Sequence, residues 1–152
     1  MILREQLNES LKTAMLAKDA LAVATLRLIL ATLKDRDIAE RSKGNLTGLS
    51  NDDIVGLLQS MIKQRRESIQ LYERGGRSDL ARQERDEIAV IERFLPPQMK
   101  DAEVESAVGA VIDEIGARSL KDMGRAMALL RERHAGRMDF AKAGAVARAR
   151  LA

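Results

Sequence analysis

The side chains of this sequence that could take part in chemistry are mainly the charged ones, because it contains no cysteine and one histidine, His134. The lack of thiols excludes disulfides, thiolate metal sites and cysteine nucleophiles. A lone histidine cannot form a two-histidine metal site, and its place near a helix end is better explained by the helix dipole. Adjacent carboxylates such as Asp113 and Glu114 diverge by about 100° on a helix, so they do not form an acid–base pair. We therefore predict no catalytic, metal or cofactor site.

Positive charge is concentrated at the C-terminal end of the sequence. Residues 118–152 carry nine Lys and Arg against three Asp and Glu, whereas residues 1–99 carry 16 against 15. A basic patch of this kind can neutralise nucleic-acid phosphates. Phe140 is the region's aromatic residue, so base stacking is not expected and a nucleic acid would be held by its shape and backbone. A merely solvated basic surface explains the charge equally well.

Acidic and basic residues alternate between residues 63 and 93, which favours ion pairs between helices over a nucleic-acid surface. The sequence leaves open whether three arginines of this stretch are structural or functional: Arg65, Arg66 and Arg77. The glycines of segment 42–48 lack the Gly-Lys-Ser/Thr ending of a phosphate loop, so we interpret the segment as a polar loop.

The elements that carry these residues are predicted to be helices. Hydrophobic content is 45% but aromatic content only 2%, so the core must consist of Leu, Ile, Val, Ala and Met, which pack well between helices. Apolar residues recur every three to four positions, beginning with a helix from about Ile2 to Ala17. Polar residues predict five helix starts. These are Asp19, Ser50 with Asp53, Asp101, Ser119 with Asp122, and Asp139.

The Leu95-Pro96-Pro97 segment predicts a boundary, because neither proline can donate a helical hydrogen bond. We predict an all-α protein of two helical bundles joined at this Pro-Pro linker. Residues 1–95 form an N-terminal bundle of about four helices, and residues 98–152 form a C-terminal domain of three shorter helices.

No membrane segment is expected. The most apolar stretch, from Ala20 to Leu33, is about 14 residues long and contains Arg27, whereas a membrane-spanning helix needs about 20 apolar residues. The N-terminus has no apolar stretch of the signal type. With the absence of cysteine, these features predict a cytoplasmic protein.

Six segments, in order, carry a resemblance to a known family. They are Lys63-Gln64-Arg65-Arg66-Glu67-Ser68-Ile69, Gly76-Arg77-Ser78-Asp79-Leu80-Ala81, Glu84, Phe94-Leu95-Pro96-Pro97-Gln98, Lys121-Asp122-Met123-Gly124 and Gly136-Arg137-Met138-Asp139. Together they resemble the GatB/YqeY family over essentially the whole chain, in its stand-alone YqeY-like form. The sequence departs from the family pattern at Met138-Asp139-Phe140, where relatives are expected to have Ala-Asp-Gly.

The resemblance implies a relation to tRNA. The family shares its two helical pieces with the tail of the B subunit of the glutamine-dependent aspartyl/glutamyl-tRNA amidotransferase, where the tail helps to hold tRNA by its outer corner. The catalytic portion of that enzyme is a separate part, and nothing resembling it is present here. The resemblance thus implies that the chain is related to a carbon–nitrogen ligase with glutamine as amido donor, and not that it has this activity itself.

The leading hypothesis is a non-catalytic tRNA-associated binding module, in which five cations of the C-terminal bundle contact phosphates: Lys121, Arg125, Arg137, Lys142 and Arg148. One alternative is an accessory component of a carbon–nitrogen ligase, which requires nucleotide and glutamine sites that the sequence does not reveal. Another is a protein-interaction adapter, with exposed Phe94 and Met99 as its signature. The expected partners are tRNA or a protein, and neither DNA nor a membrane.

Overall fold

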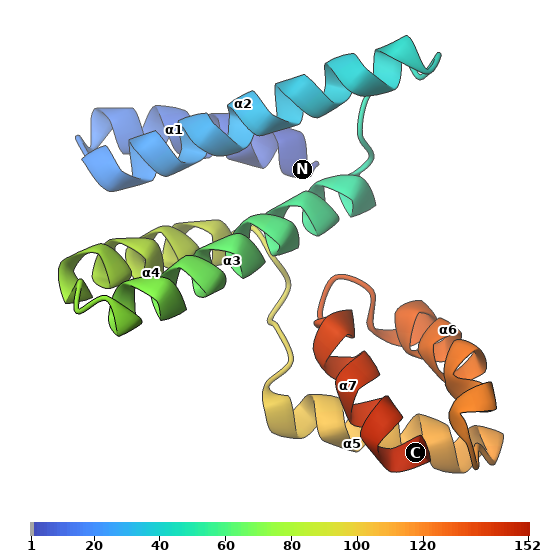
Figure 1. Cartoon of the computed structure of the whole chain (residues 1–152). Coiled ribbons are helices and arrows are strands. Elements are labelled where there is room, and N and C mark those ends of the chain that lie inside the picture. Colours follow the sequence, from blue (N-terminus) through green and yellow to red (C-terminus); the bar gives the residue numbers. More distant parts are fainter. Residues whose placement is uncertain (1) are drawn as a thin grey trace. The chain divides into compact units, whose positions relative to one another are not determined.

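The computed structural model describes residues 2–152, which contain seven α-helices, one short 3₁₀ helix and no strand (Figure 1). The prediction of an all-α protein with four helices and then three more is confirmed, and the last two, at 12 residues each, are the shorter ones. The chain divides into two compact units, one ending at Leu95 and one beginning at Pro96. The assignment of residues 1–95 and 98–152 as separate domains stays a prediction, since compactness alone does not show that each part folds by itself.

The N-terminal unit contains α1 (Leu3–Leu16), α2 (Ala20–Ser42), α3 (Asn51–Arg74) and α4 (Ser78–Glu92). Two of these helices begin at the predicted caps. Asp19 accepts a hydrogen bond from the Ala22 amide at 3.2 Å. Ser50 and Asp53 form a reciprocal capping box, in which each side chain accepts from the other residue's amide. The sequence therefore predicts these starts because the signals are local.

The core of the N-terminal unit is aliphatic. Helix α1 packs against α2, and α4 packs against both α3 and α2. Four side chains at its centre, one from each helix, are fully buried: Leu7, Ile29, Leu58 and Ile91. Burial of one such side chain contributes about 1.5–3 kcal/mol, so the helices are held mainly by this shared interior.

The C-terminal unit contains α5 (Asp101–Ile115), the 3₁₀ helix η1 (Leu120–Asp122), α6 (Met123–His134) and α7 (Phe140–Leu151). The predicted caps at Ser119 and Asp139 are confirmed. The predicted cap at Asp101 is wrong, because Asp101 is already helical and the extended cap residue is Lys100. The carboxylate of Glu103 accepts from the Lys100 amide, which leaves the Asp101 carboxylate to pair with another helix.

Small residues let α7 lie close to its neighbours. Its buried stripe is Ala143, Ala147 and Leu151, which faces a core that includes Val104 and Val108 of α5. Helix α5 runs parallel to α7, since Lys142 pairs with Asp101 near both N-termini and the guanidinium of Arg150 covers Gly109 further along. No helix among residues 2–152 is long and apolar enough to span a membrane.

Candidate nucleic-acid interface

The five cations predicted to contact phosphates are all exposed, but they do not form one cluster. Arg137 and Lys142 lie at the N-terminal end of α7, and we call them the Arg137–Lys142 group. Lys121, Arg125 and Arg148 form the Lys121–Arg148 group, because η1 packs against α7 and the short α6–α7 connection places η1 toward the C-terminal end of α7. Lys142 and Arg148 are six residues apart on α7, so these members of the two groups lie about 9 Å apart along its axis.

The Arg137–Lys142 group begins at a junction between two family motifs. Arg137 donates through Nε to the Pro97 carbonyl at 3.0 Å, and its own carbonyl accepts from the Met99 amide at 2.9 Å. The side-chain amide of Gln98 donates to the Gly136 carbonyl at 2.8 Å. These bonds fasten the segment before α5 to the loop before α7. Arg137 therefore has a structural contact, but it keeps its charge because its partner is a neutral carbonyl.

Sequence reasoning missed this junction. The only signal was that both segments, Leu95-Pro96-Pro97-Gln98 and Gly136-Arg137-Met138-Asp139, belong to the same set of family motifs. Residues about 40 positions apart cannot be paired from local spacing. Lys142, in contrast, has its charge matched, since its Nζ lies 2.9 Å from the Asp101 carboxylate.

The Lys121–Arg148 group retains more of its positive charge. Arg125 donates to the Ile115 carbonyl at the end of α5 at 3.1 Å, where the helix dipole favours a cation. Its ion pair with Asp122 is long, at 3.6 Å. The pKa of Asp122 is lowered mainly by hydrogen bonds from the Arg118 and Ser119 amides. Within the described chain, the side chains of Lys121 and Arg148 form no ion pair or hydrogen bond.

Two other arginines of the basic region are occupied by contacts within the unit. Arg133 forms a bidentate ion pair with Glu114 at 2.6 and 2.7 Å, which lowers the pKa of that carboxyl. Arg131 lies over the ring of Phe140 at 5.6 Å, and Phe140 is half-buried against the core. Phe140 therefore packs as a core residue where a glycine was expected in relatives.

The three arginines left open by the sequence all have acidic partners in the N-terminal unit. Arg65 is 9% exposed and joins α3 to α4 through Nε and Glu87 at 3.1 Å. It also donates to the Met61 carbonyl at 3.2 Å. Arg66 pairs with Glu92 at 3.7 Å, and Arg77 binds Asp79 through two hydrogen bonds. Arg65 therefore has a structural role between α3 and α4, whereas the pairs formed by Arg66 and Arg77 are exposed.

The chemistry of the other candidate sites is limited. Among residues 2–152, no group of three or more His, Asp or Glu side chains could hold a metal ion. Phe94 and Met99, the predicted signature of a protein-interaction adapter, are half-buried, each packed against the core of its own unit.

Comparison with known proteins gives consistent results over most of the chain. The family model described as "Yqey-like protein" matches residues 4–151. A curated relative from Vanderwaltozyma polyspora is 32% identical over 77% of this chain and 64% of its own length. Relatives from Lachancea thermotolerans and Saccharomyces cerevisiae are 32% and 26% identical, over 72% and 74% of this chain and 57% and 60% of their own. The chain thus spans less than two thirds of these relatives.

All three relatives are named "Altered inheritance of mitochondria protein 41, mitochondrial". These names contradict the prediction of a cytoplasmic protein. The physical reason is that the absence of cysteine is compatible with any reducing compartment, so it does not single out the cytoplasm. The family match, the relatives and the all-helical fold agree with the resemblance drawn from the six sequence segments. The chain belongs to the YqeY-like protein family.

Proposed function

We propose that the protein is a non-catalytic RNA-binding module whose C-terminal unit contacts the phosphate backbone of tRNA. The observation that carries this proposal is the unmatched charge of Lys121 and Arg148, together with Arg137, whose side-chain partner is a carbonyl. Phosphates could bind these cations without first displacing a carboxylate. The resemblance to the amidotransferase tail supports tRNA as the class of RNA.

The positions of the two groups support contact with a backbone rather than with one small anion. They lie at opposite ends of α7, and Lys142 and Arg148 project about 120° apart around its axis, since they are six residues apart. A ligand that contacts both groups must therefore be extended. An RNA backbone meets this requirement, with each neutralised phosphate releasing counterions.

The test is a filter-binding titration of the full chain with tRNA at several salt concentrations. We expect saturable binding at low salt. The double variant Lys121→Gln/Arg148→Gln should weaken this binding and reduce the slope of log affinity against log salt concentration by about one for each lost contact. Lys63→Gln/Arg82→Gln is the matched control, because it removes the same charge from exposed side chains of the N-terminal unit. The proposal fails if no saturable binding occurs, or if both double variants lose the same affinity.

The same protein tests the non-catalytic part of the proposal. An accessory role beside a carbon–nitrogen ligase leaves the purified chain inactive, because the chemistry would belong to a partner. We expect no release of glutamate from glutamine and no consumption of ATP in the presence of charged tRNA. Either activity in the purified protein, retained through a second purification step, would contradict this part.

A further inference from the structure

The N-terminal unit contains a second basic site that the proposed function does not use. A cavity of about 440 Å³ lies between α1, the C-terminal half of α2 and the loop of residues 43–50. Its volume is within the range of about 300–1,000 Å³ that is typical of small-molecule sites. The lining residues are Arg4, Lys34, Asp37, Ile38, Arg41, Leu46, Thr47 and Gly48.

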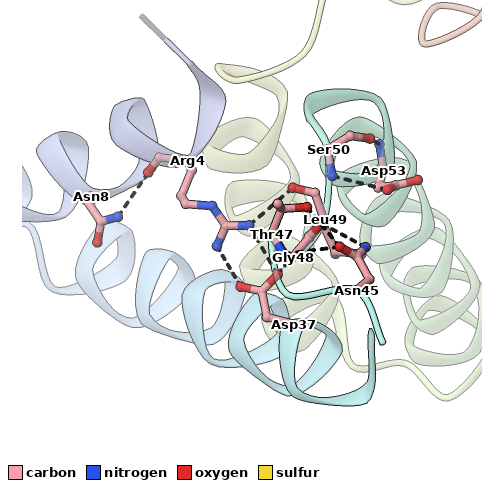
Figure 2. Close-up of polar contacts among 9 residues, drawn as sticks. All are labelled: Arg4, Asn8, Asp37, Asn45, Thr47, Gly48, Leu49, Ser50 and Asp53. Carbon is pink, nitrogen blue, oxygen red and sulfur yellow. Dashed lines mark hydrogen bonds and ion pairs between the residues drawn. The ribbon is translucent and has the colours of Figure 1, made fainter. Parts of the chain in front are cut away.

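Polar contacts join residues that line this cavity to the neighbouring loop (Figure 2). Arg4 of α1 makes two hydrogen bonds to the Asp37 carboxylate of α2, at 2.6 and 3.1 Å, and a third to the Leu49 carbonyl at 3.2 Å. The Leu49 amide donates to Asp37 at 2.9 Å. Asn45 braces the loop by donating to the Gly48 carbonyl at 3.2 Å. Two helices and the loop are thus joined around one carboxylate.

Gly48 allows the loop to approach that carboxylate closely. Its φ of +80° is unfavourable for other residues, and a Cβ atom there would lie 2.5 Å from an oxygen of Asp37. Gly44, in the same loop, also has a positive φ but has open space around it. The close approach to Asp37 is therefore a feature of Gly48, which lines the cavity, and not of the loop's glycines in general.

The charges of the lining residues do not cancel. The hydrogen bonds from Arg4 hold the pKa of Asp37 below its usual value, so this carboxylate is ionised at neutral pH and is matched by Arg4. Lys34 and Arg41 lie seven residues apart on α2, on one face and separated by about 10 Å along the axis. Both are exposed, and neither forms an ion pair in the described part of the chain. Two positive charges therefore remain at the cavity.

Two apolar side chains lie beside these cations. Ile38 is 56% exposed and Leu46 is 73% exposed, and both line the cavity. Exposed aliphatic groups next to unmatched cations suit a ligand that combines an anionic and an apolar part. A bare inorganic anion would use only the cations.

We propose that this cavity binds a nucleoside phosphate, with Lys34 and Arg41 contacting the phosphates and Ile38 and Leu46 contacting the base or sugar. The cations come from α2, so the loop needs no phosphate-loop motif in this arrangement. The same chemistry could be presented by a free nucleotide or by the 5′-phosphate end of an RNA. This site is independent of the RNA backbone contact proposed for the C-terminal unit.

Isothermal titration calorimetry tests the proposal, with the full chain titrated at low salt with ATP, adenosine or inorganic pyrophosphate. We expect saturable binding of ATP, weaker binding of pyrophosphate and no binding of adenosine. Lys34→Gln/Arg41→Gln should lower the ATP affinity by about tenfold for each cation removed, with an unchanged melting temperature. Lys63→Gln/Arg82→Gln removes the same charge from elsewhere in the unit and should leave the affinity unchanged. Ile38→Ser/Leu46→Ser should weaken ATP but not pyrophosphate.

Competition distinguishes the two sources of phosphate. A short RNA with a 5′-phosphate that displaces ATP, while its dephosphorylated form does not, identifies an RNA end as the occupant. No displacement by either RNA identifies a free nucleotide. The proposal is overturned if ATP does not bind saturably, if Lys63→Gln/Arg82→Gln weakens it equally, or if both RNAs displace it equally. Binding of tRNA to the C-terminal unit is measured separately and does not affect these outcomes.

Discussion

The two units of the protein use their basic residues differently. In the N-terminal unit, pairs of opposite charge join neighbouring helices: Arg4–Asp37, Arg65–Glu87, Arg66–Glu92 and Arg85–Glu73. The C-terminal unit has such pairs in Arg133–Glu114 and Lys142–Asp101, but the main side-chain hydrogen bonds of Arg125 and Arg137 go to backbone carbonyls. A carbonyl positions a guanidinium without neutralising it, so the C-terminal unit keeps a positive surface.

The comparison shows why the number of arginines alone does not identify a ligand site. What differs is where the carboxylates lie: they are nearly as numerous as the cations throughout residues 1–99, whereas in the C-terminal unit five of them lie in residues 100–117 and three accompany the nine cations of residues 118–152. Surface ion pairs contribute about 0–1 kcal/mol each, whereas a buried pair is costly to break. Replacing the most buried arginine should therefore have the largest effect on stability.

The largest effect is expected from Arg65→Ala in the N-terminal unit. This change removes a buried guanidinium and leaves the half-buried Glu87 without its partner, so the free energy of unfolding should fall by about 3 kcal/mol. Urea denaturation measures this value, and Arg82→Ala on the exposed face of α4 should change it by no more than about 0.5 kcal/mol. Equal losses in the two variants would mean that the Arg65 pair has no special structural role.

Gly48→Ala should have the next largest effect. The new Cβ would displace Asp37 and strain the backbone, so the free energy of unfolding should fall by about 2 kcal/mol. Gly44→Ala is the matched control, because it has a positive φ but no steric contact, and it should cost about 1 kcal/mol. Urea denaturation of both variants separates the steric part from the backbone part. A Gly48→Ala loss no larger than that of Gly44→Ala would contradict the close contact with Asp37.

Arg137 and Arg148 allow the comparison to be sharpened within the C-terminal unit. Arg137→Ala removes the hydrogen bond to Pro97 and should lower the free energy of unfolding by about 1 kcal/mol. Arg148→Ala should leave stability unchanged but weaken tRNA binding. Arg137→Lys keeps the charge and loses the Nε bond, so we expect it to lose stability while retaining most of the tRNA affinity. If Arg137→Lys binds tRNA as weakly as Arg137→Ala, the guanidinium geometry matters more than its charge.

The sequence was informative where structure is local. Caps at Asp19, Ser50, Ser119 and Asp139 follow from a side chain and an amide two or three residues away, so the helix starts could be predicted. The predicted cap at Asp101 was wrong because the choice of Asp101 or Lys100 as the cap residue depends on a backbone angle and on the competing carboxylate of Glu103. Such competition is not visible in spacing alone.

The sequence was less informative about the sites. It revealed the excess charge of residues 118–152, but not which cations are matched by partners such as the Asp101 carboxylate, 41 residues from Lys142. It also identified residues 42–48 only as a loop, since the contact of Gly48 with Arg4 and Asp37 joins three distant segments. Pairings of this kind depend on tertiary packing, for which periodicity gives no register.

The smallest expected effect concerns Glu84, which tests whether the charges of the N-terminal unit are fully balanced. Partial burial, and secondarily the charge of Glu87, raise the pKa of Glu84. The folded protein therefore holds the Glu84 carboxyl proton more tightly than the unfolded chain does. The contribution of Glu84 to stability decreases as the pH rises from its pKa in the unfolded chain to its raised pKa in the folded protein. Glu84→Gln should thus be more stable than the parent at pH 7, by about 0.5 kcal/mol, with the difference vanishing near pH 4. Urea denaturation at both pH values measures it, with exposed Glu67→Gln as the control. A Glu84→Gln variant that is less stable at pH 7 would show that the attraction between Glu84 and Arg65 outweighs the burial of Glu84, so that Arg65 interacts favourably with a second carboxylate besides Glu87.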